Sequence, residues 1–231
     1  MWVDALLILG GYLFGAFPVV YLLGRMRGFD LSKEEDMHIS LWRKVGRREG
    51  FTGIAWDVVK GGVAVGLLRI FYLDSGHWGT VVGVGVAIVV GRMWSIFLKF
   101  RGEKANTTSL GVEIALAYQA TAFVLVPILL GVTIRTLPRM LDSRQSVNER
   151  LRFGGPPSLS LPLAMLVAYA MFPIGCWYYD QPWTTTVAGV AIFALIVVKR
   201  LSAGLLDDLK TATASTGSIL LNRALFDRSY I

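Results

Sequence analysis

Apolar residues are gathered into long blocks separated by polar, glycine-containing segments. The five longest blocks cover residues 3–24, 51–73, 79–98, 109–134 and 158–179, and a shorter sixth block covers 184–198. A helix of about 20 residues rises about 30 Å, which matches the hydrocarbon core of a bilayer. Backbone groups in lipid must be hydrogen-bonded within their own segment, so this pattern predicts membrane-spanning helices.

The composition favours a membrane protein over a soluble domain. Of the 231 residues, 54% are hydrophobic and 17% are charged, and the mean hydropathy is +0.56. A net charge of +7 is also found in nucleic-acid-binding proteins, but those gather basic residues on a polar surface, whereas here they lie between apolar blocks. We therefore predict no nucleic-acid partner. The single cysteine, Cys176, lies in an apolar block and is expected to pack as a small buried residue.

Lysine and arginine are concentrated in a few polar segments. Of the 23 basic residues, 20 lie in residues 25–50, 99–104, 135–152 and 199–231. The connections 74–78 and 180–183 hold none. By the positive-inside rule, the basic segments are cytoplasmic and the N-terminus is outside. The first apolar block has no basic residue before it, so we expect a retained anchor rather than a cleaved signal.

One apolar block fits this orientation only if it reverses. Residues 109–134 stand alone between two basic segments that the rule places on the same side. We expect a hairpin: a short, broken or re-entrant helix from about Thr108 to Tyr118, a turn near Gln119, and a helix back to Ile134. The alternative places the arginines of 135–152 outside. With the hairpin, the chain is an all-α, multi-pass transmembrane helical bundle of about seven crossings.

These expectations give one transmembrane domain and a tail. The domain covers residues 1–204, with cytoplasmic loops at 25–50, 99–108 and 135–157, and the cytoplasmic tail covers 205–231.

Three cations follow the third apolar block, in the stretch FLKFRGEKANTTSLG (97–111). Lys99, Arg101 and Lys104 lie where one crossing ends and the broken helix begins. Gly102 allows a tight turn, and the start of the next helix would point unpaired N–H groups at the same space. This stretch is a candidate phosphate site. The alternative is that the three cations only anchor the chain at the membrane interface.

Residues 24–50 form the second polar concentration. Arg43 and Arg47 are one helical turn apart, so they share a face that can meet an anion or lipid headgroups. His38 is the only histidine in a segment predicted to be cytoplasmic, and with Asp36 nearby it is a candidate general base. The alternative for His38 is a solvated loop histidine.

Charged residues also occur within the apolar blocks. Asp57 and Lys60 are three residues apart and can pair on one helix face. A charge near mid-membrane costs about 2.5 to 3.5 kcal/mol, so this pair should face the bundle interior, either as a structural lock or as the lining of a site. Glu113 is expected to line a cavity from the short helix. Arg69 and Arg92 lie near block ends, from which their side chains can reach the interface.

Familiar motifs for other chemistries are absent. The sequence has no P-loop, no dinucleotide-binding glycine pattern, no HExxH metal site and no nucleophile elbow. We therefore predict no metal site and no cofactor. What remains is a group of cations at the lipid boundary, which is suited to holding a soluble phosphorylated molecule beside an acyl chain.

Four stretches resemble the PlsY family, the bacterial integral-membrane glycerol-3-phosphate acyltransferases that use acyl phosphate as donor. They are GAFPVVYLLGRMRGFDLSK (15–33), DVVKG (57–61), GRMWSIFLKFRGEKANTTSLG (91–111) and KRLSAG (199–204). The likeness follows the family's order along the whole chain, and FLKFRGEK at a cytoplasmic loop is its most specific part. The chain resembles a divergent member of the family.

The divergence falls on polar positions of the family motifs. In the first two motifs, a serine, an asparagine, a histidine and two glycines of the family are replaced by Asp36, His38, Arg92, Glu103 and Ala105. In the third motif, a histidine, an asparagine and a glutamate of the family fall on Ala194, Val197 and Leu206.

The resemblance implies transfer of a fatty acyl group from acyl phosphate to the 1-hydroxyl of glycerol 3-phosphate, giving lysophosphatidic acid for phospholipid biosynthesis. It implies that Lys104, Gly102 and Arg43 bind substrate, while Asp36 and His38 are the candidates for proton handling. The expected partners are acyl phosphate, glycerol 3-phosphate and the lipids of the bacterial inner membrane. The alternatives are a non-catalytic lipid-binding or regulatory relative, and a small transporter.

Overall fold

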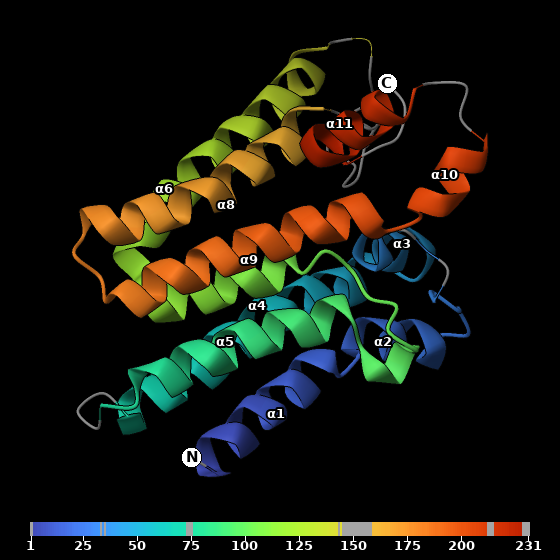
Figure 1. Ribbon diagram of the computed structural model, residues 1–231. Helices are drawn as coiled ribbons and strands as arrows, with labels where there is room; N and C mark the ends of the chain where they lie inside the picture. The colour runs from blue at the N-terminus through green and yellow to red at the C-terminus, as the bar shows by residue number, and fades with distance from the viewer. Residues whose placement is uncertain are drawn as a thin grey trace.

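The computed structural model describes residues 2–32, 34, 36–72, 76–142, 144, 159–211 and 215–227, and within these ranges the regular structure is helical throughout. The helices are α1 (Trp2–Ala16), α2 (Val19–Met26), α3 (Met37–Lys44), α4 (Arg47–Tyr72), α5 (Trp78–Met93), a 3-10 turn η1 (Ile96–Leu98), α6 (Asn106–Leu141), α8 (Ser160–Tyr178), α9 (Trp183–Ser202), α10 (Leu205–Thr211) and α11 (Thr216–Phe226). Figure 1 shows them as one bundle with short helices at its edge. The all-α prediction is confirmed.

Several helical stretches are long and apolar enough to cross a membrane. They are Trp2–Met26, Trp78–Leu98, Asn106–Leu141, Ser160–Tyr178 and Trp183–Ser202. Helix α4 is of similar length but carries Asp57, Lys60 and Arg69. These helices confirm a multi-pass membrane protein, and the number of crossings stays a prediction.

The long helices run back and forth between two ends of the bundle (Figure 1). At one end lie the N-terminus and the connections at 76–77 and 179–182. At the other end lie residues 27–32, 36–46, 94–105, 203–211 and 215–227, which include most of the basic motif segments. We call this second end the motif end. The chain thus brings segments that are far apart in sequence to one end, as the charge pattern predicts.

Helix α6 reverses direction inside its apolar block. Its backbone is non-helical at Ala117, with φ −155° and ψ 79°. Before this break α6 packs along α4, and after it Gly131 packs against Ser160 at the start of α8. The predicted hairpin is therefore present, and its turn lies close to the expected Gln119.

Arg69 supports this break. Its Nη1 donates to the carbonyl oxygen of Ala115 at 3.0 Å and is 3.4 Å from that of Leu116. These carbonyls end the first half of α6 and lose their helical partners at the break, so the guanidinium satisfies them. Arg69 also lines an open pocket with Trp78, Gln181 and Pro182, so the expectation that it reaches the interface stays a prediction.

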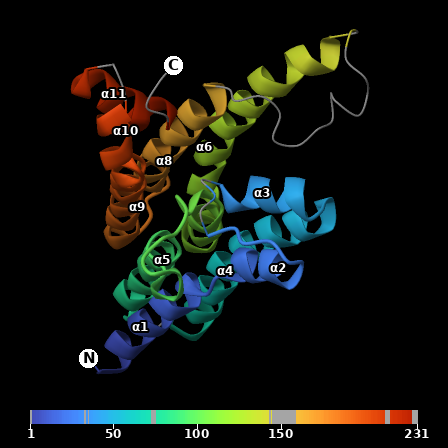
Figure 2. The same ribbon diagram turned by 90° about the vertical axis from the view of Figure 1, so that its right-hand side faces the viewer.

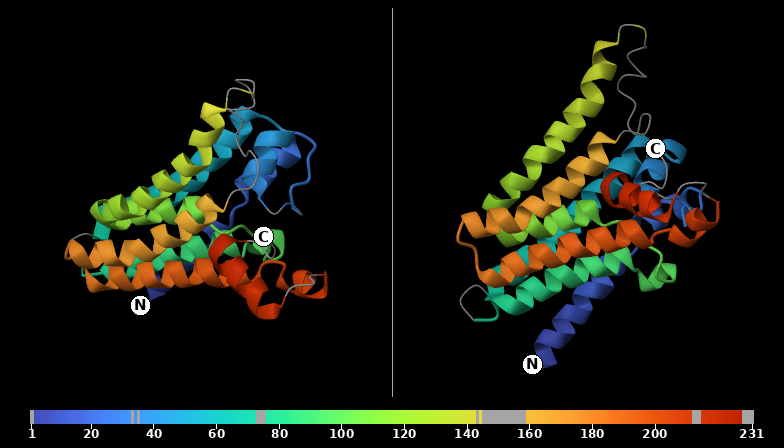
Figure 3. Two further views of the ribbon diagram at one scale, coloured as in Figure 1. Left: turned by 90° about the horizontal axis from the view of Figure 1, so that it is seen from above. Right: turned by 45° about the horizontal axis from the view of Figure 1, so that its top comes forward.

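The second half of α6 is longer than the apolar pattern predicts. It ends at Leu141 rather than Ile134 and continues past the start of α8 (Figures 2 and 3). Hydropathy marks where lipid contact ends, whereas charged residues such as Arg135 and Arg139 continue a helix readily. Most of the predicted loop at 135–157 lies outside the described residues.

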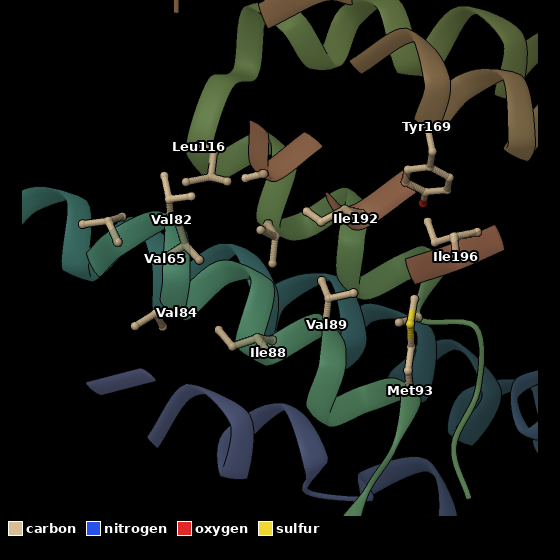
Figure 4. Close-up of a cluster of buried hydrophobic side chains, with 14 residues drawn as sticks. Val65, Val82, Val84, Ile88, Val89, Met93, Leu116, Tyr169, Ile192 and Ile196 are labelled. Carbon is tan, nitrogen blue, oxygen red and sulfur yellow. The ribbon is translucent and has the colours of Figure 1, made fainter. Parts of the chain in front are cut away.

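The hydrophobic core lies where α4, α5, α6, α8 and α9 meet. Its labelled members in Figure 4 are Val65, Val82, Val84, Ile88, Val89, Met93, Leu116, Tyr169, Ile192 and Ile196. Close contact between α4 and α6 depends on Gly111, where a Cβ atom would lie 2.0 Å from the Val58 carbonyl oxygen. Cys176 is buried in a second cluster between α6 and α8, as expected.

Candidate functional site

Four segments supply the candidate site: α3, the first half of α4, the end of α5, and the loop from Trp94 to Ala105. Helix α3 begins at Met37 because the Asp36 carboxylate accepts a hydrogen bond from the Ile39 N–H at 2.9 Å. In the loop, Lys99, Phe100 and Ala105 have positive φ values of 55°, 61° and 56°. Such backbone is strained for residues other than glycine, and strain of this kind is common at functional sites.

Gly102 fixes this loop against the end of α5. A Cβ atom at residue 102 would lie 2.3 Å from the Arg92 carbonyl oxygen and 2.6 Å from that of Met93. Glycine is thus needed here for close backbone approach, rather than for the tight turn that the sequence indicates. The contact places Glu103 and Lys104 beside the motif end of α5.

Asp57 is the centre of a buried charge network. Its Oδ1 lies 2.8 Å from Lys60 Nζ, and its Oδ2 lies 2.7 Å from Arg92 Nε and 3.0 Å from His38 Nε2. Asp57, Lys60 and Arg92 are all buried. The predicted Asp57–Lys60 pair is confirmed. Arg92 turns inward to Asp57, so the expectation that it reaches the interface is wrong.

Glu103 joins this network to α3. Its Oε1 accepts the Met37 N–H at 2.5 Å, and its Oε2 is ion-paired with Arg92 Nη2 and lies 3.4 Å from His38 Nε2. Met37 is the first residue of α3, where N–H groups lack helical partners. Glu103 therefore ties the first predicted motif loop to the second and sets the position of His38.

His38, Asp57 and Glu103 have donor atoms that all lie within 4.8 Å of one another, a spacing that a metal ion can bridge. In this structure the Arg92 guanidinium contacts both carboxylates, and Lys60 contacts the remaining Asp57 oxygen. Protein cations thus already neutralise the two carboxylates, so the cluster is an ion-pair network and we assign no metal to it.

The environment of α3 raises the pKa of both predicted proton-handling groups. Burial alone would lower the pKa of His38, but the carboxylates of Glu103 and Asp57 outweigh it and raise the His38 pKa above its ordinary value. Burial, followed by repulsion from Glu103, raises the pKa of Asp36. His38 is not a solvated loop residue: its Nε2 is engaged and its Nδ1 is buried without a partner among the described residues.

The three residues predicted to bind substrate, Lys104, Arg43 and Gly102, differ in burial and in their contacts. Lys104 is half-buried, and its Nζ is ion-paired with Asp227 of the C-terminal tail. Arg43 is exposed in the last turn of α3. Gly102 directly precedes Glu103, which belongs to the charge network. Lys104 is therefore not a simple surface anchor, whereas Lys99 and Arg101 are exposed.

The first half of α6 starts directly after Lys104 and carries buried polar groups. The Thr108 and Ser109 hydroxyls and both Glu113 carboxyl oxygens are buried, without partners in the part of the chain that the structure describes. Ala105 precedes this helix and offers no side-chain cap. The Thr108 and Ser109 hydroxyls can donate to an anion or to water, which fits the predicted phosphate site, whereas an ionised Glu113 carboxylate would repel a phosphate.

Comparisons with known proteins agree with this arrangement. A sequence model of the family described as glycerol-3-phosphate acyltransferase matches residues 5–205. That match covers most of the chain, including α3, the 94–105 loop and the network. The chain belongs to this family.

Individual relatives are consistent with the family. Glycerol-3-phosphate acyltransferase 4 of Dehalococcoides mccartyi (strain CBDB1) is 26% identical, with 96% of this chain and 88% of that protein covered. Glycerol-3-phosphate acyltransferase of Prochlorococcus marinus (strain NATL2A) is 30% identical, with 72% of this chain and 79% of that protein covered.

A solved structure shares the fold. It is the glycerol 3-phosphate form of PlsY, an integral membrane glycerol 3-phosphate acyltransferase, which is 20% identical with a TM-score of 0.67. The likeness covers 90% of this chain and 92% of that chain. The acyltransferase family fold thus holds the charge network at the motif end.

Sequence reasoning missed the roles of Arg92, Glu103 and Asp227 in this family member. Arg92 and Glu103 were visible as departures from the family pattern, and their opposite charges were a signal that they form a pair. Asp227 gave no such signal because its partner, Lys104, is 123 residues away in sequence.

Proposed function

We propose that this protein transfers a fatty acyl group from acyl phosphate to the 1-hydroxyl of glycerol 3-phosphate, releasing inorganic phosphate and giving lysophosphatidic acid. Membership of the glycerol-3-phosphate acyltransferase family carries this proposal. The relatives named above are glycerol-3-phosphate acyltransferases, and the chain covers most of their length. The acyl phosphate donor rests on the PlsY resemblance. The place proposed for the reaction is the cytoplasmic face of a bacterial inner membrane, with the N-terminus outside and the C-terminus inside.

The acceptor phosphate is proposed to bind at Lys104. Lys104 lies two residues before the first half of α6, so its ammonium is close along the chain to N–H groups that have no partner within the helix. Gly102 fixes the loop that carries Lys104, and Arg43 of α3 is proposed as a second cation for the phosphate. An ammonium and a guanidinium both form charge-assisted hydrogen bonds with phosphate oxygens.

The proton of the acceptor hydroxyl is proposed to pass to His38. In the reaction the hydroxyl oxygen attacks the acyl carbonyl carbon, the bond to the phosphate leaving group breaks, and the hydroxyl loses its proton. Asp57 and Glu103 hold His38 Nε2, so Nδ1 is the nitrogen left to accept that proton. Because Nδ1 is buried, this proposal requires a rearrangement of the site that opens Nδ1 to the acceptor hydroxyl. Asp36 caps α3 next to His38, and its part in proton handling remains a proposal.

A non-catalytic, lipid-binding relative is the second candidate. The pairing of Lys104 with Asp227 favours it, because that lysine already has an anionic partner. The replacement of polar third-motif residues by Ala194, Val197 and Leu206 points the same way.

Acylation by purified protein separates the two candidates. We expect lysophosphatidic acid to form from glycerol 3-phosphate and an acyl phosphate, detected by mass spectrometry with phosphate release measured in parallel. A protein that yields no lysophosphatidic acid with this donor would exclude the acyltransferase proposal for these substrates. Product formed only with another acyl donor would exclude the acyl phosphate assignment alone.

The pH dependence of this reaction tests His38. A base with a raised pKa is protonated at low pH, so kcat/KM should rise with pH through an inflection above about 6.5, the ordinary histidine value. His38→Gln should lower the rate about 100-fold or more and remove the inflection. The matched control is His77→Gln, which changes the exposed histidine at the opposite end of the bundle. An unchanged inflection in His38→Gln would exclude His38 as the base.

A further inference from the structure

The C-terminal tail is docked on the motif end of the bundle. Helix α11 packs against α8 and α9 and buries Ile219, which is 1% exposed. The helix begins where the Ser215 hydroxyl oxygen accepts the Ser218 N–H at 3.3 Å. Figure 1 shows α11 beside α8 and above α9. The burial of Ile219 thus fixes the position of the tail on the bundle.

Two buried arginines form hydrogen bonds that hold the tail in this position. Arg200 of α9 donates to the Ala224 carbonyl oxygen at 3.2 Å and to the Pro162 carbonyl oxygen at 2.9 Å. Arg223 of α11 donates to the Ala203 carbonyl oxygen and to Asp208. These bonds join α11 to α8, α9 and α10 without using Lys104.

Asp227 is placed by this docking. It is the residue that ends α11, with φ 61°, and its N–H donates to the Arg223 carbonyl oxygen at 3.0 Å. Its carboxylate is ion-paired with Lys104 Nζ, and the two side chains are 18% and 29% exposed. The docking of the tail thus places the Asp227 carboxylate against Lys104, the residue that is proposed to bind the substrate phosphate.

We infer that Asp227 is a specificity-determining residue of this site: it takes the place of the substrate phosphate at Lys104 and sets how tightly glycerol 3-phosphate binds. This inference rests on the proposed function. A carboxylate and a phosphate both accept hydrogen bonds from an ammonium, and two anions at one cation repel each other. Glycerol 3-phosphate therefore has to displace Asp227 from Lys104. The family model matches residues 5–205. Helix α11 and Asp227 therefore lie outside the part of the chain that this model matches.

Asp227 is expected to affect the binding of glycerol 3-phosphate rather than the chemical step. Asp227 contacts Lys104, whereas His38 contacts Asp57, Glu103 and Arg92. Neutralising Asp227 should therefore lower the KM for glycerol 3-phosphate and leave kcat unchanged.

Direct binding tests the inference without turnover. Glycerol 3-phosphate is titrated calorimetrically into full-length protein in detergent, with no acyl donor present. Asp227→Asn should bind about threefold to tenfold more tightly than wild type, as expected for removal of a competing ion pair that is partly exposed. The matched control is Asp30→Asn, which removes the same charge from an exposed pair with Arg25 and should leave the Kd unchanged.

The outcomes separate this inference from the proposed function. Equal Kd values for wild type and Asp227→Asn, with clear binding in both, overturn the inference and leave the proposed function standing. Tighter binding in both Asp227→Asn and Asp30→Asn also overturns it, because general charge would then be the cause. If neither wild type nor Asp227→Asn binds glycerol 3-phosphate, the proposed function fails and the inference fails with it.

Discussion

Protein carrying Asp57→Asn is expected to unfold at a much lower temperature than wild type. The Asp57 carboxylate is the shared partner of Lys60, Arg92 and His38, and an amide leaves two buried cations without a full counter-charge. Breaking a buried ion pair by removing one partner costs about 3–5 kcal/mol, which is a large part of the stability of a typical domain. Thermal unfolding of the detergent-purified protein, followed by light scattering and tryptophan fluorescence, measures the change.

Asp30→Asn is the matched control for this substitution. Asp30 and its partner Arg25 are exposed and 3.8 Å apart, so loss of this pair should cost less than about 1 kcal/mol. If Asp57→Asn and Asp30→Asn unfold at the same temperature, the buried network does not hold α3, α4 and α5 together.

Lys104→Gln is expected to lower kcat/KM for glycerol 3-phosphate by about 100-fold. Loss of a charge-assisted hydrogen bond to phosphate costs about 1.5–3 kcal/mol, and each 1.36 kcal/mol is a factor of ten. In the structure Lys104 is paired with the Asp227 carboxylate. The phosphate of the proposed substrate is likewise an anion. Steady-state rates of lysophosphatidic acid formation at varied glycerol 3-phosphate measure the effect.

Lys99→Gln tests the competing interpretation that the cations only anchor the loop. Lys99 is in the same loop and exposed, so its substitution removes the same charge at the interface. We expect its kcat/KM to stay within about twofold of wild type. Equal losses in Lys99→Gln and Lys104→Gln would support anchoring and remove the case for a phosphate site at Lys104.

The hairpin in α6 was predictable because it follows from the count of basic segments on each side of the membrane. Local sequence does not mark the break: Ala117 is a good helix former, and the hairpin is required only by the arginines that follow. The Asp57–Lys60 pair was predictable from helical spacing alone. The first prediction depends on the distribution of charge along the whole chain and the second on local helical spacing, and tertiary structure overrode neither.

The rest of the site depends on partners far apart in sequence. Arg92 lies near the end of an apolar block, where the pattern allows either an interfacial or an inward side chain, and its partner Asp57 is 35 residues away. Met37 and Glu103 are likewise 66 residues apart. Periodicity reports which face of a helix is buried, but not which charged groups two helices bring together. The candidate site could thus be located from the sequence, while its connections could not.

The break at Ala117 also bears on how the chain enters the bilayer. The first half of α6, residues 106–116, is about 16 Å long at a rise of 1.5 Å per residue, about half the hydrocarbon thickness. Lipid alone cannot satisfy its exposed terminal carbonyls, whereas Arg69 of α4 does so. This half is therefore stable only beside an α4 that is already in place. We therefore expect α4 to enter the bilayer before the reversed segment or together with it.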